Sequence, residues 1–215
     1  MPELSHSGGE IISYIEMCQA WSVSLQRGMN FHLRPDCSVI LMSRRSNAPY
    51  RDQITDEGRV LIYEGHDVPR TSKNADAKLV DQPGKTPGGK LIQNGLFYEA
   101  AFRAKNGGFV PEIVAAYEKI HAGIWAFNGL FGLTGASIES DGRRKVYRFR
   151  LELIESAEAL ISEPERDILH TRVIPSAVKL EVWQRDKGKC ALRGRQEPPL
   201  RSRASLFQRW RLLCS

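Results

Sequence analysis

The sequence predicts an α+β fold, in which a β-sheet forms the core and helices lie at its flanks. Two short apolar runs rich in β-branched residues, at 37–43 and 59–65, have the composition of buried strands. Segments 124–140 and 143–154 also have strand character, and the Ser-Asp-Gly-Arg stretch that joins them contains an Asp-Gly hairpin signal. These observations predict four strands, two of which pair in a long hairpin.

Several other segments predict helices or loops. Residues 10–27 carry apolar side chains at helical spacing, and residues 91–105 also predict a helix. Residues 111–122 begin with proline, which suits a first helical turn, and repeat apolar side chains with the period of an amphipathic helix. Residues 66–90 are polar and contain glycine and proline breakers, so we expect a long functional loop. The charged residues 155–172 predict a helical linker.

Composition narrows the function classes. The 215 residues suffice for one core with a small appendage, and no run of about 18 apolar residues predicts a membrane span. Four scattered cysteines and an N-terminus without a signal-peptide pattern favour a reducing cytoplasm. The net charge is +6, but the segment from Arg172 onward holds 11 basic and 3 acidic residues. The rest has 20 basic and 22 acidic residues, so a nucleic-acid surface there must be local.

Two tyrosines frame the most informative stretch of the chain. Tyr50 ends a loop with Asp52 beside it, and Tyr63 lies near the end of a predicted strand that continues into Glu64 and Gly65. Taken singly, a tyrosine in a strand is more often a packing residue, and an aspartate in a loop can cap a turn. The prediction of function therefore depends on several motifs taken together.

The stretch NAPYRDQITDEGRVLIYEGHDVPR resembles the SRA (SET- and RING-associated) domain, and AAYEKIHAGIWAFNGLF and DGRRKVYRFRLEL resemble bacterial members of that family. The resemblance covers residues 28–155. It implies an SRA-type (PUA-like) curved β-barrel with flanking helices, which flips a modified cytosine out of duplex DNA. We therefore divide the chain into an N-terminal helical segment at 1–27, an SRA-like domain at 28–156, a linker at 157–172 and a C-terminal segment at 173–215.

The resemblance also implies roles for individual residues. Tyr50 and Tyr63 would sandwich the flipped base, a stacking arrangement typically worth about 1–3 kcal/mol per base. Asp52 would accept a hydrogen bond from the cytosine N4 amino group, and the backbone at Glu64 and Gly65 would contact the remaining edge. The spacing from Tyr50 to Gly58 is one residue longer than in eukaryotic members, so Gln53 and Asp56 remain alternatives to Asp52.

In the same family, two loops enter the duplex gap, and the segments 30–36 and 69–90 are the candidates here. Basic residues near these loops are candidate phosphate contacts, although each is equally consistent with a solvated surface charge. They are Arg44, Arg45, Arg70, Lys73 and Lys78. The histidines at 32, 66, 121 and 170 are not spaced as a metal site, and we assign no residue a catalytic role.

The stretch RVIPSAVKLEVWQRDKGKCALRG resembles the opening of an HNH endonuclease domain, a ββα unit in which a histidine activates water beside a divalent ion. The family continues into Cys-x-x-Cys, whereas Arg193 stands here at the second cysteine, and no His or Asp follows Cys190. Cys190 is then a remnant of a zinc-type ligand set, and the C-terminal ββα unit is incomplete.

The tail after Leu192 suggests an out-of-frame translation of an HNH core. If two bases, TG, are restored after a CTG codon for Leu192, the tail from Cys190 can be translated as CALCGAARNLHFDHELPFSKGGAS with suitable synonymous codons. That string supplies Cys-x-x-Cys, an Asp-His pair and the Ser-Lys-Gly-Gly of the family. Slippage at a TGTG tandem and a sequencing error would both produce this pattern.

The leading hypothesis is a protein that binds double-stranded DNA containing 5-methyl- or 5-hydroxymethylcytosine, as the recognition part of a modification-dependent restriction system. One alternative is an active SRA–HNH endonuclease that cleaves modified DNA. Another is a related barrel that binds RNA or a small ligand. We expect no cofactor in this chain, with a divalent metal and a structural zinc only in an intact HNH domain. We expect no membrane partner and a cytoplasmic protein located at the bacterial nucleoid when DNA-bound, with a homodimer left open.

Overall fold

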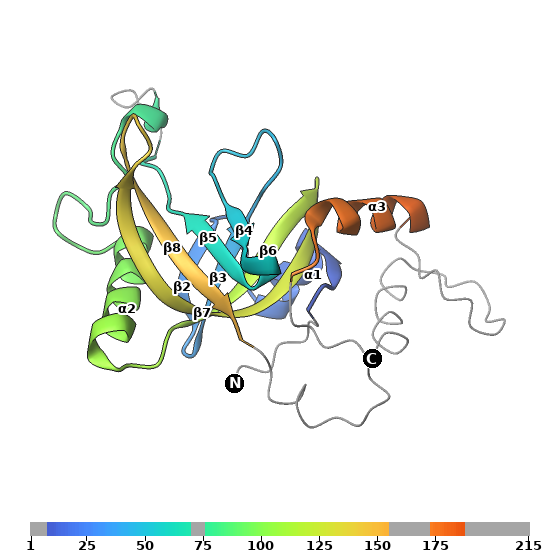
Figure 1. The fold of residues 1–215 in the computed structure, drawn as a ribbon, viewed down its shortest axis with the longest axis horizontal. Helices are drawn as coiled ribbons and strands as arrows, with labels where there is room; N and C mark the ends of the chain where they lie inside the picture. The colour runs from blue at the N-terminus through green and yellow to red at the C-terminus, as the bar shows by residue number, and fades with distance from the viewer. Residues whose placement is uncertain (1–7, 70–75, 155–172, 188–215) are drawn as a thin grey trace. The chain divides into compact units, whose positions relative to one another are not determined.

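The computed structural model describes residues 8–69, 76–154 and 173–187, and the chain divides into two compact units, 1–174 and 175–215 (Figure 1). The first unit is a single strongly curved sheet with helices packed against it. Its strands are β1 (Ile11–Ser13), β2 (Met29–Arg34), β3 (Cys37–Met42), β4 (Gln53–Thr55), β5 (Val60–Glu64), β6 (Ile113–His121), β7 (Ile124–Ser140) and β8 (Lys145–Leu153).

The strands run in the order β2-β3-β6-β7-β8-β5-β4, and β1 pairs with the beginning of β7. Neighbouring strands are antiparallel except for β3 and β6. Opposite β6, Asn128 is an extra residue in β7, and the next residue, Gly129, has a φ of +116°. Such a bulge bends a strand and increases its twist, which contributes to the curvature that β7 and β8 show in Figure 1.

Two apolar clusters form the core of the first unit. One lies under α2 (Gln93–Gly107) and contains Tyr63, Phe97 and Phe149. The other lies beside α1 (Tyr14–Trp21), where Trp21 Nε1 donates a 2.9 Å hydrogen bond to Tyr117 Oη. The long strand β7 contributes side chains to both clusters and so connects the two halves of the sheet.

Local sequence explains where several elements begin and end. Ser13 and Glu16 form a reciprocal capping box that starts α1. Between β7 and β8, Asp141 Oδ1 accepts hydrogen bonds from the N–H groups of Arg143 and Arg144, and Gly142 adopts a φ of +93°. A left-handed residue at this turn favours glycine, so the Asp-Gly signal identified the turn for a physical reason.

The structure confirms several of the predicted elements and the coarse α+β class. The runs 37–43 and 59–65 are β3 and β5, and the long hairpin is β7 and β8. The helix predicted at 91–105 is α2. Within the described part of 66–90, a short 3-10 helix, η2 (Ala77–Leu79), is the only helix in an otherwise irregular loop.

Two predictions were wrong, and that of a helix at 10–27 was right only in part. Residues 111–122 contain the strand β6, not a helix, because β6 lies between β3 and β7 and is buried on both faces, so its apolar residues do not alternate. Residues 10–27 form β1 and the short helix α1 before a loop, because Ser22 ends the helix in the left-handed conformation. The predicted loop at 30–36 is mostly β2, and only the turn at Pro35 and Asp36 remains.

The second unit contains α3 (Ser176–Asp186), which coincides with the apolar opening of the HNH-like segment.

A second 3-10 helix, η1 (Asp56–Gly58), precedes β5 in the first unit, and the N–H group of Val173 donates to Gly58 O. Val173 is thus part of the core of the first unit. The predicted linker at 157–172, Cys190 and the proposed out-of-frame tail lie outside the described residues.

Candidate nucleic-acid interface

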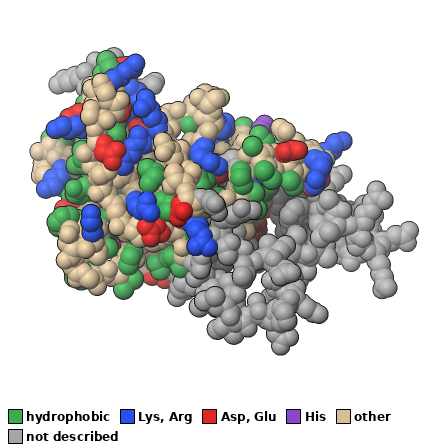
Figure 2. Space-filling view, in the orientation of Figure 1, with side chains coloured by type: hydrophobic (Ala, Val, Ile, Leu, Met, Phe, Trp, Pro, Cys, Tyr) green, Lys and Arg blue, Asp and Glu red, His purple; other side chains and the backbone are tan. Residues whose placement is uncertain are grey.

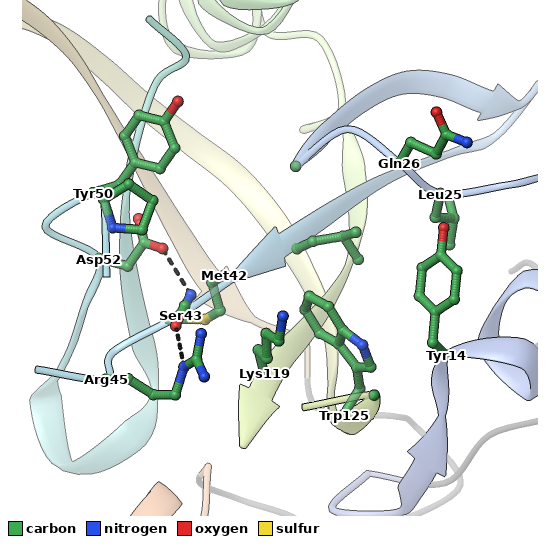
Figure 3. A pocket seen from close by; sticks show the side chains of 14 residues that line it. Tyr14, Leu25, Gln26, Met42, Ser43, Arg45, Tyr50, Asp52, Lys119 and Trp125 are labelled. Carbon is green, nitrogen blue, oxygen red and sulfur yellow. Dashed lines mark hydrogen bonds between the residues drawn. The ribbon is translucent and has the colours of Figure 1, made fainter. Parts of the chain in front are cut away.

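A cleft of about 550 Å³ opens on the first unit, where segments far apart in the sequence meet (Figure 3). The loop before β2, the end of β3, the loop that follows it and the β6–β7 hairpin all contribute to its walls. The polar and aromatic side chains on which the argument depends are Gln26, Arg45, Tyr50, Asp52, Lys119 and Trp125. On the face drawn in Figure 2, Lys and Arg side chains are interspersed with Asp and Glu, as expected for a nearly neutral body.

Asp52 supplies a carboxylate to one end of the cleft. Its side chain is only 8% exposed, and its two oxygens accept hydrogen bonds from the backbone N–H groups of Ser43 (3.0 Å) and Glu64 (3.1 Å). Burial raises its pKa to about 6, although these two hydrogen bonds act in the opposite direction. Each carboxylate oxygen retains a second lone pair, so a ligand can still donate to this fixed group.

Tyr50 lies beside Asp52 and is held from outside the cleft. The Lys78 ammonium lies 4.2 Å from the Tyr50 ring centroid and also contacts Pro49 O. The His66 ring is stacked near Tyr50 at a centroid distance of 6.0 Å. Burial raises the pKa of Tyr50, so its phenol is neutral at ordinary pH. The ring is therefore an oriented aromatic surface at the cleft.

A buried charge network anchors Lys78. Asp67 Oδ2 lies 2.8 Å from Lys78 Nζ, and Asp67 Oδ1 lies 2.6 Å from the guanidinium of the buried Arg144. Burial alone would raise the pKa of Asp67, but hydrogen bonds from Lys78, Gln82 and Arg144 outweigh it and lower that pKa. The network connects the turn of the β7–β8 hairpin to the residue that lies over Tyr50.

Tyr63 is not where the sandwich prediction requires it. Its side chain is 2% exposed and is packed in the core under α2, and Tyr63 Oη donates a 3.1 Å hydrogen bond to Gly28 O. No ring face is therefore open to a base in this arrangement. Gly28 lines the cleft, and a Cβ atom there would lie 2.7 Å from Tyr63 Oη and 2.8 Å from His66 Nε2. Tyr63 thus supports a wall of the cleft instead of lining it.

Glu64 and Gly65 also lie behind the cleft. The Glu64 carboxylate accepts from the N–H group of Arg51 and pairs with Arg148 at 3.2 Å. The N–H group of Gly65 donates to Tyr147 O, and Gly65 O accepts from Gln82 Nε2 at 2.7 Å. Since these polar groups already have partners in the fold, the structure does not support the predicted contact between this backbone and a base edge.

The structure separates the alternatives that the sequence left open for the carboxylate. Gln53 is exposed on β4 and lines a different cleft. Asp56 is exposed in η1, where its φ is +51°. Of the three candidates, Asp52 is the one that lines the same cleft as Tyr50.

The candidate phosphate contacts differ in their surroundings. Arg44 Nε lies 2.9 Å from Glu118 Oε1, and Lys78 is paired with Asp67, so both charges have partners within the fold. Arg45 is exposed and lines the cleft. Arg70 and Lys73 lie outside the described residues.

Sequence reasoning missed part of the cleft. Gln26, Lys119 and Trp125 line it together with Tyr14, and none belongs to the tyrosine-framed motif. Lys119 and Trp125 are directly opposite each other in the β6–β7 register. Correct assignment of β6 as a strand would have paired them, but the helical spacing of its apolar residues concealed that signal.

A scan against protein-family models finds no match, and a search of curated proteins finds none either. Solved structures do resemble the chain. The SUVH5 SRA domain in complex with hemimethylated CG DNA shares 18% identity over 71% of this chain and 91% of its own, with a TM-score of 0.49. The SUVH5 SRA domain bound to fully hydroxymethylated CG DNA shares 17% identity over 71% of this chain and 91% of its own, with a TM-score of 0.47. The DNA modification-dependent restriction endonuclease AspBHI shares 18% identity over 78% of this chain and 73% of its own, with a TM-score of 0.45.

The described residues contain neither a metal-binding cluster nor a membrane-spanning helix. Among residues 8–69, 76–154 and 173–187, no group of three or more His, Cys, Asp or Glu side chains is arranged to hold a metal ion. In the same part of the chain, no helix is long and apolar enough to cross a membrane.

Proposed function

We propose that this protein binds double-stranded DNA containing a modified cytosine and takes the flipped base into the cleft of Tyr50 and Asp52. The observation that carries the proposal is the carboxylate of Asp52, which two backbone N–H groups fix in the same cleft as the face of Tyr50. The tyrosine-framed motif of the sequence, which resembles the SRA family, supports the same function.

The chemistry of the cleft suits a cytosine-type base. An ionised Asp52 accepts from the N4 amino group of cytosine, whereas thymine presents a carbonyl oxygen at that position and is repelled. Because the backbone fixes Asp52 before a ligand arrives, little side-chain entropy is lost on binding. Discrimination at one such base edge is typically worth about 1–3 kcal/mol.

The walls suit the rest of the base. Tyr50 offers a stacking surface, and the apolar side chains of Leu41 and Met42 line the same cleft. A 5-methyl group that leaves water for such a wall gains about 0.8 kcal/mol. Both 5-methyl- and 5-hydroxymethylcytosine are proposed ligands.

We test the proposal by titrating the full chain with matched duplexes that differ only in one cytosine: unmodified, 5-methyl or 5-hydroxymethyl. We expect tighter binding of a modified duplex and a decline in affinity with rising salt. Asp52→Asn should bind all three duplexes more weakly, because each cytosine carries the N4 amino group, while Glu99→Gln, at an exposed position of α2, is the matched control. Equal affinity of the wild type for all three duplexes at several salt concentrations would refute the proposal.

Two alternative functions are decided by separate assays. An active SRA–HNH endonuclease requires catalytic groups in the segment after residue 187, so cleavage of modified plasmid DNA with Mg²⁺ or Mn²⁺ is the relevant measurement. A barrel that binds RNA or a small ligand would release methylated duplex DNA when RNA is added as a competitor. The cytoplasmic location and a homodimer stay predictions.

A further inference from the structure

Two basic residues of the cleft, Lys119 and Arg45, have no acidic partner among the described residues. Lys119 Nζ lies 5.7 Å from the centroid of the Trp125 ring, and Arg45 Nε donates to Ser43 Oγ at 3.4 Å. Neither makes an ion pair within the described part of the chain, whereas Arg44 and Lys78 each pair with a carboxylate. Figure 3 shows Arg45 and Lys119 between Asp52 on one side of the view and Trp125 on the other.

The cleft is also larger than a base. A 5-methylcytosine has nine non-hydrogen atoms, and even at the share of about 30 Å³ that a water molecule takes in the liquid, they fill at most about 270 Å³. The cleft measures about 550 Å³. A base would therefore leave about half of the cleft unfilled, and Lys119 and Trp125 belong to the residues that line the same cleft.

We infer that the cleft holds a whole flipped nucleotide, and that Lys119 and Arg45 bind a phosphate next to the flipped base. This inference rests on the proposed function and assigns a phosphate subsite to the same cleft. A nucleotide joins a hydrogen-bonding base to an anionic phosphate, and the cleft offers a buried carboxylate at one end and two cations beyond it. Both cations carry only donors, which suits phosphate oxygens.

Trp125 positions the ammonium of Lys119. The indole is 9% exposed, and its place in the apolar cluster beside α1 fixes its orientation. An ammonium over the face of such a ring is attracted to it without losing its charge. Lys119 is therefore held at the cleft and remains available to an anion.

Charge also distinguishes this occupant from a bulky neutral substituent on the base. A sugar attached at the 5-position would fill a similar volume, but it would leave both cations without a counter-charge. A phosphate of the DNA is present beside every flipped base, whatever its modification. We therefore expect the two cations to contribute to binding of any flipped cytosine.

The test uses the full chain and a duplex with one 5-methylcytosine, in which a phosphate flanking that base is either natural or replaced by a neutral methylphosphonate. For the wild type we expect about a tenfold loss of affinity when the critical phosphate is neutral, the scale of one charge-assisted hydrogen bond. Lys119→Gln should lose part of this affinity on the natural duplex, with a salt slope reduced by about one, and become less sensitive to the replacement. The double variant Lys119→Gln/Arg45→Gln should be insensitive to it. Arg45→Gln, in an exposed loop, repeats the test without altering a strand.

Lys105→Gln, at the exposed end of α2, is the matched control and should retain the sensitivity of the wild type. If the wild type prefers the methylated duplex but neither variant nor the neutral linkage changes its affinity, the phosphate subsite is wrong and the proposed function stands. If the two variants lose affinity only for a duplex with glucosylated 5-hydroxymethylcytosine, the cations serve the substituent and the inference is overturned. If the wild type does not prefer modified DNA at all, both conclusions fall.

Discussion

The ammonium of Lys78 lies over the ring of Tyr50 at 4.2 Å from its centroid, while Asp67 holds the same ammonium from the other side at 2.8 Å. Asp67 is in turn bound by the buried guanidinium of Arg144. A residue that the sequence marked as a phosphate contact is therefore part of a fixed support behind an aromatic wall. The two roles predict different behaviour on substitution.

Lys78→Met keeps much of the side-chain length and removes the charge. If Lys78 orients Tyr50, the variant should lose affinity for the modified duplex in preference to the unmodified one, by about 0.5–2 kcal/mol, the range of a cation–π contact. A phosphate contact would instead weaken both duplexes alike and reduce the salt slope by about one. Titration of both duplexes at several salt concentrations separates the two, and a uniform loss would contradict the positioning role.

The pKa of Asp52 makes base recognition sensitive to pH. Burial raises that pKa from 3.8 to about 6, and Glu64 also raises it, while Arg148 lowers it. Because protonation removes the negative charge of Asp52 and turns one of its two accepting oxygens into a donor, affinity for the modified duplex should fall as pH decreases below about 6. His66, whose pKa burial lowers to about 4, stays neutral in this range. Binding measured between about pH 5 and 8 should show this decline in the wild type and not in Asp52→Asn.

The raised pKa of Asp52 also affects stability, and it does so with a pH dependence opposite to that of binding. Asp52 binds its proton more tightly in the folded state than in the unfolded chain, so the free energy of unfolding should decrease as pH rises from 3.8 to about 6 and level off above that. The Asp52→Asn variant should lack this contribution, which is on the order of 2 kcal/mol. Denaturant titrations of both proteins across this range measure the difference. A wild-type contribution that instead grows with pH would show that the pKa is lowered.

Substitutions of Tyr63 test whether this residue supports a wall of the cleft or stacks on the flipped base. Tyr63→Phe removes the hydroxyl that donates to Gly28 O, and it should cost about 0.5–1.5 kcal/mol of stability with a ring still in place. Tyr63→Ala should cost about 3–5 kcal/mol, because the ring is fully packed in the core. Tyr50→Ala should instead lose discrimination at little cost in stability. Thermal denaturation and duplex binding of the three variants test this, and a stable Tyr63→Ala protein without discrimination would restore the sandwich.

The sequence was informative where local pattern determines structure and misleading where packing does. The apolar runs of β3 and β5 and the Asp-Gly turn after β7 have strong local signals, so those elements were predicted. The strand β6 was missed because a strand buried on both faces has no period of two, and its apolar spacing happens to fit a helix. Because β6 was predicted as a helix, the pairing of Lys119 with Trp125 across the β6–β7 hairpin was also missed.

The candidate site shows the same division. Asp52 and Tyr50 are two residues apart, and the sequence motif alone was enough to predict that they share a site. Tyr63 belongs to the same motif, yet its position in β5 places its ring under α2, because the two faces of a strand point in opposite directions. Which face a side chain occupies depends on the register with β8, where Tyr63 is opposite Phe149, and sequence spacing does not reveal that register.

The last prediction concerns the tail after Leu192, which lies outside the described residues. If it is an out-of-frame translation, the gene should contain codons from Arg193 to Arg211 that spell the HNH residues one base later. Trp210 gives a fixed point, because its single codon, TGG, leaves two bases that force a glycine in the shifted frame, in the Gly-Gly that the family pattern requires. We expect the chain as given not to cleave DNA. A gene with the two bases restored should encode a protein that cleaves modified plasmid DNA with a divalent metal. Its Asp-His pair, changed to Ala-Ala, is the control for contaminating nuclease. Sequencing the gene is the direct check: any other set of codons in that interval rules the idea out, whatever the cleavage assay shows.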